Sequence, residues 1–169
     1  MCFKKRDRRA QMFNIKILES ETEADAAIIQ AVATIESVVQ LQEPWTEQAL
    51  NDLLEQDSID LMVVMSIEIN EVVGYCLYQV MFEQAEILRI GTRPDYQRQG
   101  IASQIFARLN KVLKDSQVDN LLLEVRADNA PAIALYERQE FVVIHKRKGY
   151  YQLPHQPAVD ALIMQNVYR

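Results

Sequence analysis

A short polar turn that holds one glycine constrains this chain more than any other stretch of its sequence. Residues 94–103 read PDYQRQGIAS. This turn follows a strand-like run at 85–92, and after it apolar residues recur at helical spacing, among them Ile101, Ile105 and Leu109. The sequence therefore predicts a strand, a glycine loop and a helix N-terminus in direct succession. Free backbone amides and the positive end of the helix dipole meet at such an N-terminus, and both stabilise a bound anion.

Gly100 and Arg98 give this loop the character of a phosphate site. The glycine lets a ligand approach the backbone, and the guanidinium offers a planar donor fork that suits the oxygens of a pyrophosphate. A Walker loop would need a lysine after its second glycine, and a dinucleotide fingerprint would need three clustered glycines. The chain has four glycines in all, at 74, 91, 100 and 149. Neither of these nucleotide-binding motifs is therefore present.

Length and composition indicate one globular domain. The chain has 169 residues, of which 49% are hydrophobic and 25% charged. No apolar run is long enough for a transmembrane helix, and the basic start is followed by no signal-peptide core. We therefore expect a cytoplasmic protein with no membrane partner. The two cysteines, Cys2 and Cys76, give neither a disulfide framework nor a metal-ligand spacing, so no metal is expected.

The charge is unevenly distributed along the chain. Residues 1–11 carry five Lys or Arg and one Asp, a net charge of +4, so the total of −6 leaves −10 for the remainder. An acidic body disfavours nucleic acid as a partner and attracts basic substrates. We expect residues 1–12 to be a tail outside the fold, either disordered or not native, and a functional basic arm is the alternative. The folded domain is expected over residues 13–169.

Hydrophobic periodicity predicts an α/β protein with a mixed, mostly antiparallel sheet of six to seven strands and helices on both faces. Thr22 and Thr46 are predicted to start the first two helices. The run NLLLEVR at 120–126 has the pattern of a strand that is buried on both faces. Strands are predicted at 13–18, 61–67, 72–81, 85–92, 120–126, 141–146 and 158–168, and helices at 22–39, 46–57, 101–117 and 130–139.

Two residues in the second half are candidates for acid–base chemistry. Glu124 is a carboxylate within an apolar strand, where burial favours the protonated form and so suits a general base. The alternative is an ordinary strand-end glutamate paired with Arg126 or solvent. Tyr136 lies about two helical turns after Asn129, and its phenol, with an ordinary pKa near 10, is a candidate proton donor. Most helical tyrosines only pack, and that alternative stays open here.

Three segments together resemble the GNAT acyl-CoA-dependent N-acetyltransferases, and within them the RimI-type ribosomal-protein-alanine N-acetyltransferases. They read RIGTRPDYQRQGIAS, LLLEVRADNAPAIALYE and PHQPAVDALIM, and EPWTEQAL before the second helix is a further similar feature. The resemblance covers nearly everything after Phe13. It implies a sheet that is splayed at the cofactor cleft, with acetyl-CoA as the co-substrate.

The resemblance also assigns residues to roles. Gln97, Gly100 and Ala102 match the pattern of the pyrophosphate loop, in which Ala102 is the permitted variant. Glu124 matches the proton acceptor and Tyr136 the proton donor of the family. The implied cofactor-binding residues are Ile90, Gly91, Thr92, Gln97, Arg98, Gln99, Gly100, Ile101, Ala102, Ser103 and Asn129, of which Asn129 is also the expected cap of its helix.

Gly91 and Glu140 call for a separate comment. Gly91 fits a bulge or a close backbone approach, although an ordinary weak point in a strand is the alternative. The family usually has a glycine before the phenylalanine that corresponds to Phe141, and here Glu140 takes that position. A non-glycine residue in a left-handed helix cap is strained, so we expect either a different helix end or lower local stability.

The resemblance implies a peptide acceptor bound between the loop around Trp45 and the hairpin near Tyr150 and Tyr151. Core packing explains Trp45 equally well. The expected activity is acetylation of a protein N-terminal α-amine, that of an alanine-starting ribosomal protein. The alternatives are acetylation of lysine side chains or small amines, and a non-catalytic acyl-CoA-binding module. The sequence carries no information on the oligomeric state.

Overall fold

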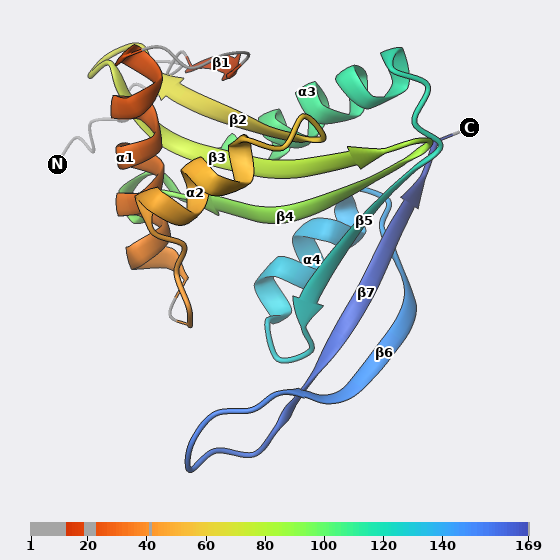
Figure 1. Ribbon diagram of the computed structural model, residues 1–169. Helices are drawn as coiled ribbons and strands as arrows, with labels where there is room; N and C mark the ends of the chain where they lie inside the picture. Colours follow the sequence, from red (N-terminus) through yellow and green to blue (C-terminus); the bar gives the residue numbers. More distant parts are fainter. Residues whose placement is uncertain (1–12, 19–22, 41, 169) are drawn as a thin grey trace, which may run out of the picture.

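The computed structural model describes residues 13–18, 23–40 and 42–168. There it has seven strands, four α-helices and one short 3-10 helix, and the strands and α-helices follow the predicted order (Figure 1). The strands are β1 (Phe13–Ile17), β2 (Ile59–Ser66), β3 (Glu71–Met81), β4 (Gln84–Thr92), β5 (Asn120–Arg126), β6 (Val142–Tyr151) and β7 (Val159–Val167). The helices are α1 (Glu23–Val39), α2 (Glu47–Leu54), η1 (Pro94–Tyr96), α3 (Ile101–Asp115) and α4 (Ala130–Arg138).

The strands form one sheet in the order β1-β2-β3-β4-β5-β7-β6. Neighbouring strands are antiparallel except for β4 and β5, which are parallel. Parallel strands cannot be joined by a hairpin, and α3 provides the crossover between these two. The predicted fold class, a mixed and mostly antiparallel sheet with helices on both faces, is confirmed.

Each face of the sheet buries its own apolar cluster. The cluster under α3 and α4 contains Ile105, Phe106 and Tyr136, and the cluster under α1 and α2 contains Val32 and Leu50. Figure 1 shows α1 and α2 in front of the sheet and α3 behind it. We call these two sides the α3/α4 face and the α1/α2 face.

The sheet opens between β4 and β5. Their pairing ends where Ile87 lies opposite Leu123, and beyond this point the strands diverge (Figure 1). A bulge on β4 accompanies the opening, because the pairing with β3 skips Leu88. Leu88 packs on the α1/α2 cluster, and the next residue, Arg89, also reaches that face. A bulge bends its strand and redirects its side chains, and here it coincides with the predicted splay.

Strand β5 is buried on one face only, so the prediction of burial on both faces is wrong. Leu121, Leu123 and Val125 are buried in the α3/α4 cluster. Because side chains alternate along a strand, Glu124 and Arg126 lie on the α1/α2 face, where each is only partly buried. The opened sheet and the absence of a described helix over this half of the α1/α2 face leave them accessible.

The C-terminal hairpin is longer than predicted. Strand β6 was expected to end at Lys146, but it continues to Tyr151 and includes the residues that were assigned to a connection. Its polar residues resemble a loop in sequence because β6 is an edge strand, exposed over most of its length. Gly149 is in the left-handed region at φ +59°, and its amide donates to Asp160 Oδ1 at 2.8 Å.

Helix α4 is followed by Glu140 in the left-handed conformation, which is strained for any residue other than glycine. Glu140 has a φ of +67°. The amide of Phe141 donates to the carbonyl of Tyr136 at 3.1 Å, and the amide of Glu140 donates to that of Glu137 at 3.0 Å. This is the Schellman arrangement, in which glycine is the favoured residue. Glu140 therefore takes the usual place of the glycine without changing the helix end.

The predicted helix starts have different outcomes. Thr46 caps α2, because its side chain accepts from the amide of Ala49 at 3.2 Å. Thr22 and the tail at 1–12 lie outside the described residues. In the part of the chain that the structure describes, no helix has the length and apolar character to span a membrane.

Candidate active site

The loop before α3 has the shape of an anion site. Gly100 has a φ of +82°, and no heavy atom lies within 4 Å of the position that a Cβ would take there. The glycine is therefore required by the backbone conformation, and the space before it is open. Arg98, also at positive φ, is exposed beside it.

The start of α3 differs from two other described helix starts. Thr46 caps α2, and the side chain of Asn129 caps α4 by accepting from the amide of Ala132 at 3.3 Å. At Gly100, among the described residues, no side chain accepts from the first amides of α3. The first-turn amides of a helix need an external acceptor, so this end is available to an anion. Asn129 is thereby confirmed as a cap, and its contact with a cofactor stays a prediction.

The two glutamines of the loop bond within the loop itself. Gln97 donates to the carbonyl of Thr92 at 3.2 Å, and Gln99 donates to that of Asp95 at 3.1 Å. Arg93 bonds Asp95 through two nitrogen atoms, at 2.7 and 2.9 Å. These contacts hold the turn in shape, so in this structure Gln97 and Gln99 fix the backbone that precedes α3.

On the splayed part of β4, Gly91 is explained by a close approach. A Cβ at this position would lie 2.6 Å from the ring of Tyr75 on the neighbouring strand. The bulge lies at Leu88 and not at Gly91. Ile90 packs against the α3/α4 cluster, and in the described pairing the segment from Leu88 to Thr92 has no partner on β5. Backbone groups on that side of β4 are therefore free to contact a ligand in the opening.

Glu124 lies on β5 beside the opening, with both carboxylate oxygens engaged. The hydroxyl of Tyr151 donates to Oε1 at 2.9 Å, and Arg147 Nη1 donates to Oε2 at 2.9 Å. Its side chain is 24% exposed. The alternative pairing with Arg126 is not present, since Arg126 bonds Asp128 and stacks over the ring of Tyr151.

A second carboxylate, Glu86 on β4, lies near Glu124 and was missed in the sequence. Glu86 is exposed, yet partial desolvation of its carboxyl raises the pKa, the negative charge of Glu124 raises it further, and the charge of Arg147 opposes the shift. Glu86 is opposite Leu122 in the parallel pairing, so its side chain shares the face of Glu124. Only the strand register could reveal this neighbour, and the register is not readable from one sequence.

Tyr136 lies on the α3/α4 face. Its ring packs against Phe106 and Phe141, with 6.0 Å between centroids in each case. Burial raises the pKa of Tyr136 to about 12, with a further contribution from Cys76. The phenol is therefore fully protonated at neutral pH and is a weaker acid than an exposed tyrosine. Glu124 and Tyr136 thus belong to opposite faces of the sheet, on either side of the opening.

Trp45 is fixed by a buried ionic network that sequence reasoning missed. Glu36, fully buried on α1, accepts from Arg89 Nε at 3.0 Å, from the amide of Trp45 at 3.4 Å and from the hydroxyl of Tyr75. Arg89 stacks over the Trp45 ring, 4.3 Å from its centroid. Its charge also acts on Tyr151, where it opposes a pKa that burial raises. Arg89 therefore contacts Trp45 directly, and its charge also acts on Tyr151 in the second aromatic region that was predicted to bind the acceptor.

The aromatic pair at the end of β6 forms the other side of this region. The rings of Tyr150 and Tyr151 meet edge to face, 5.1 Å between centroids, and Arg147 lies 4.9 Å from the centroid of Tyr150. Tyr150 is 52% exposed. On this face of the sheet, Tyr151 and Arg147 both bond Glu124, and Arg89 stacks over Trp45.

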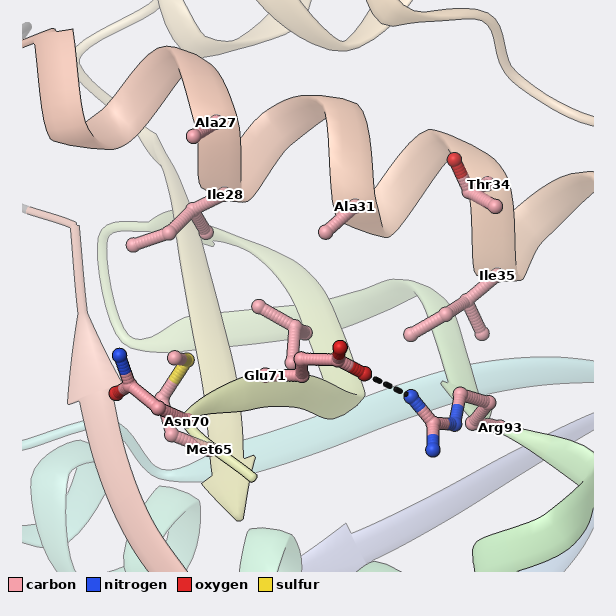
Figure 2. Close-up of a pocket in the computed structure, with 10 residues that line it drawn as sticks. Ala27, Ile28, Ala31, Thr34, Ile35, Met65, Asn70, Glu71 and Arg93 are labelled. Atoms are coloured by element: carbon pink, nitrogen blue, oxygen red, sulfur yellow. Dashed lines mark hydrogen bonds and ion pairs between the residues drawn. The ribbon is translucent and has the colours of Figure 1, made fainter. Parts of the chain in front are cut away.

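A separate cavity of about 410 Å³ lies between α1 and the β2–β3 hairpin, as Figure 2 shows. Its α1 wall consists of apolar and small side chains, among them Ile28 and Ala31. The ion pair between Glu71 and Arg93, 2.7 Å long, closes one end. None of its lining residues is one that the sequence predicts to bind or react. In the described ranges, no three His, Cys, Asp or Glu side chains are grouped as metal ligands.

Comparison with known proteins identifies the family. Residues 27–141, more than half of the chain, match the acetyltransferase (GNAT) family. The chain belongs to the GNAT family. The predicted resemblance is therefore confirmed, and GNAT membership makes the protein an acetyl-CoA-dependent N-acetyltransferase.

Several of its relatives within the GNAT family are ribosomal-protein N-acetyltransferases. The chain is 32% identical over 121 residues to the [ribosomal protein bS18]-alanine N-acetyltransferase of Escherichia coli K12, covering 72% of this chain and 79% of that protein. It is 30% identical over 121 residues to the enzyme of the same name from Haemophilus influenzae, covering 72% and 80%. The crystal structure of the ribosomal-protein-S18-alanine N-acetyltransferase from Escherichia coli superposes with a TM-score of 0.80, at 30% identity, over 92% of this chain and 94% of that one.

Proposed function

We propose that this enzyme transfers an acetyl group from acetyl-CoA to the N-terminal α-amine of a protein, and that the acceptor is an alanine-starting ribosomal protein in the cytoplasm. The names of the relatives support the acceptor class. The acidic body favours the approach of a basic protein such as a ribosomal one.

The observation that carries the proposal is the division of the site between the two faces of the sheet. The uncapped start of α3 and the phenol of Tyr136 lie on the α3/α4 face. Glu124, Trp45 and Tyr151 lie on the α1/α2 face. The opening between β4 and β5 joins these faces, so a thioester held there meets an acceptor from the opposite side.

Glu124 acts as the general base in this proposal. A protein α-amine has a pKa of about 8, so at neutral pH most of it is ammonium and must lose a proton before it can attack. Glu124 takes this proton through a water molecule. The neutral nitrogen then forms a bond to the thioester carbonyl carbon. The nitrogen releases its second proton to solvent as the carbon–sulfur bond breaks, and Glu124 returns the first proton to solvent.

Tyr136 acts as the general acid. The departing thiolate takes the phenolic proton, and the ionised phenol regains a proton from solvent before the next cycle. Burial of Tyr136 makes this transfer less favourable than it would be for an exposed phenol. A thiolate that is buried in the same apolar surroundings is more basic too, which restores part of the match.

The pyrophosphate of acetyl-CoA binds at the start of α3 in this account. The predicted contacts are the backbone of Gly100, Ile101, Ala102 and Ser103 and the guanidinium of Arg98. The contacts of Ile90, Gly91, Thr92 and Asn129 with the pantetheine arm belong to the same proposal. They are supported by the unpaired edge of β4 beyond Ile87.

Mass spectrometry of an acetylated peptide tests the proposal. The peptide begins with alanine and carries internal lysines, and a matched control has the same sequence with a blocked N-terminus. We expect one acetyl group on the α-amine, release of one CoA for each peptide, and no reaction of the blocked control. Acetylation of the internal lysines in both peptides would instead assign the enzyme to ε-amines. CoA release with small amines alone would exclude a peptide acceptor.

A further inference from the structure

Two donors bind the carboxylate of Glu124. Its Oε1 accepts from Tyr151 and its Oε2 from Arg147, each at 2.9 Å. Each carboxylate oxygen can accept a second hydrogen bond, so a water molecule can still reach this base. The acceptor ammonium must come close to the same carboxylate, however, where Arg147 is the cation already in place. The inference below rests on the proposed function and concerns what happens to this cation when the acceptor binds.

The hydrogen bond from Arg147 to Glu124 is easier to displace than the ion pair between Arg126 and Asp128. Arg126 binds Asp128 through two nitrogen atoms, at 2.8 and 2.9 Å, within one turn of chain. Arg147 reaches Glu124 through one nitrogen atom, across the sheet, from an edge strand where its side chain is 49% exposed. Single, partly exposed ion pairs contribute little to stability, and the guanidinium has solvent to move into.

Arg147 places a positive charge beside two carboxylates. Glu86 and Glu124 lie on the same face, and the negative charge of Glu124 raises the pKa of the Glu86 carboxyl while the charge of Arg147 lowers it. Arg147 also bonds Glu124 directly. A positive group in the place of Arg147 would keep both carboxylates compensated. An N-terminal ammonium is positive, smaller than a guanidinium, and has three donors for the surrounding oxygens.

We propose that Arg147 occupies the place of the acceptor ammonium opposite Glu124, and that the acceptor enters by displacing it. Arg147 is thereby a specificity-determining residue, because only an amine that arrives protonated can exchange for the guanidinium. The exchange also brings the ammonium close to Glu124, the group that must take its proton. In that step an N–H bond breaks and the proton passes through a water molecule to the carboxylate, while Arg147 keeps its own protons.

Peptide binding to the CoA-loaded enzyme tests this proposal without turnover. An alanine-starting peptide is titrated by calorimetry into the natural enzyme and into Arg147→Gln, Arg147→Lys and Lys148→Ala. Lys148→Ala removes a positive charge from the adjacent position of β6, so it reports the effect of net charge alone. The peptide with an acetylated N-terminus controls for contacts that do not involve the ammonium.

We expect Arg147→Gln to bind the free peptide about fivefold more tightly than the natural enzyme, because no ion pair has to be broken. Arg147→Lys and Lys148→Ala should bind it like the natural enzyme, and the acetylated peptide should gain nothing in any variant.

Two results would overturn the inference. Equal affinity in Arg147→Gln and Lys148→Ala would show that no displacement occurs. A lower kcat with unchanged affinity in Arg147→Gln would show that Arg147 only positions Glu124. If the natural enzyme neither binds nor acetylates the peptide while still binding CoA, the proposed function itself fails and the inference falls with it.

Discussion

The two faces of the sheet build their halves of the site in different ways. On the α3/α4 face the site consists mainly of backbone, namely the uncapped start of α3 behind Gly100 and the unpaired edge of β4. On the α1/α2 face it consists of side chains, with Arg89 stacked over Trp45 and with Tyr151 and Arg147 bonded to Glu124. The backbone half suits a constant ligand such as a pyrophosphate. The side-chain half can change with the acceptor.

Replacing Glu124 by glutamine should show most clearly that catalysis and acetyl-CoA binding depend on different halves of the site. The substitution keeps the shape of the side chain but removes the base, so we expect kcat to fall about 10³-fold. The affinity for acetyl-CoA should stay within about twofold, because that ligand binds the other face in our account. Steady-state kinetics and calorimetry measure the two quantities. An unchanged kcat would remove the assignment of Glu124.

Tyr136→Phe tests the acid on the α3/α4 face. The ring keeps its packing against Phe106 and Phe141, so the free energy of unfolding should change little, while kcat should fall about 10²-fold. Because its pKa is about 12, Tyr136 stays protonated up to about pH 11. A loss of activity at lower alkaline pH must then come from another group, so it should have the same midpoint in Tyr136→Phe. Full activity of this variant would contradict its role as the acid.

A negative charge at Ser103 should weaken the binding of acetyl-CoA without weakening the fold. Ser103 is exposed in the first turn of α3, where Ser103→Glu places a carboxylate beside the expected pyrophosphate. We expect about tenfold weaker binding of acetyl-CoA, together with a gain of about 0.5 kcal/mol in the free energy of unfolding from the helix dipole. Calorimetry and urea denaturation measure these opposite effects.

The matched control is Ala107→Glu, at an exposed position one turn further along α3. It adds the same charge beyond the reach of the first-turn amides, so both effects should be much smaller there. Equal losses of affinity in the two variants would indicate a general charge effect and not a site at the helix start.

Glu140→Gly should change neither half of the site. It places glycine at a position with φ +67°, so we expect a gain of about 1 kcal/mol in the free energy of unfolding, with kcat and both affinities unchanged. Glu137→Gly, inside α4 and exposed, is the control and should lose a similar amount. A loss of stability in both variants would show that Glu140 makes a contact that outweighs its backbone strain.

The backbone half of the site was predictable from the sequence because its causes are local. A glycine followed by helical periodicity is enough to place Gly100 at the start of α3, and the cap at Asn129 is visible in four consecutive residues. The side-chain half depends on register and tertiary contact. Glu86 comes beside Glu124 only through the parallel pairing, and Arg147 reaches Glu124 from a strand 23 positions away.

Hydrophobic periodicity also gave wrong predictions for the length of β6 and for the burial of β5. The edge strand β6 carries polar residues on both faces, so its second half had the sequence of a loop. Strand β5 looked fully buried because leucines occupy both of its faces in the run from Leu121 to Leu123. Glu36 gave no sign of its role, since its partner Arg89 is 53 residues away and a bulge directs that side chain.

Hydrogen–deuterium exchange tests most directly the claim that donor and acceptor bind opposite faces of the sheet. Exchange is followed by mass spectrometry in the free enzyme, with CoA, and with CoA plus an alanine-starting peptide. We predict that CoA slows exchange at residues 98–103 and leaves 147–153 unchanged, and that the peptide then slows exchange at 147–153 with no further effect at 98–103. Protection of 98–103 by the peptide alone, or of 147–153 by CoA alone, would contradict the account.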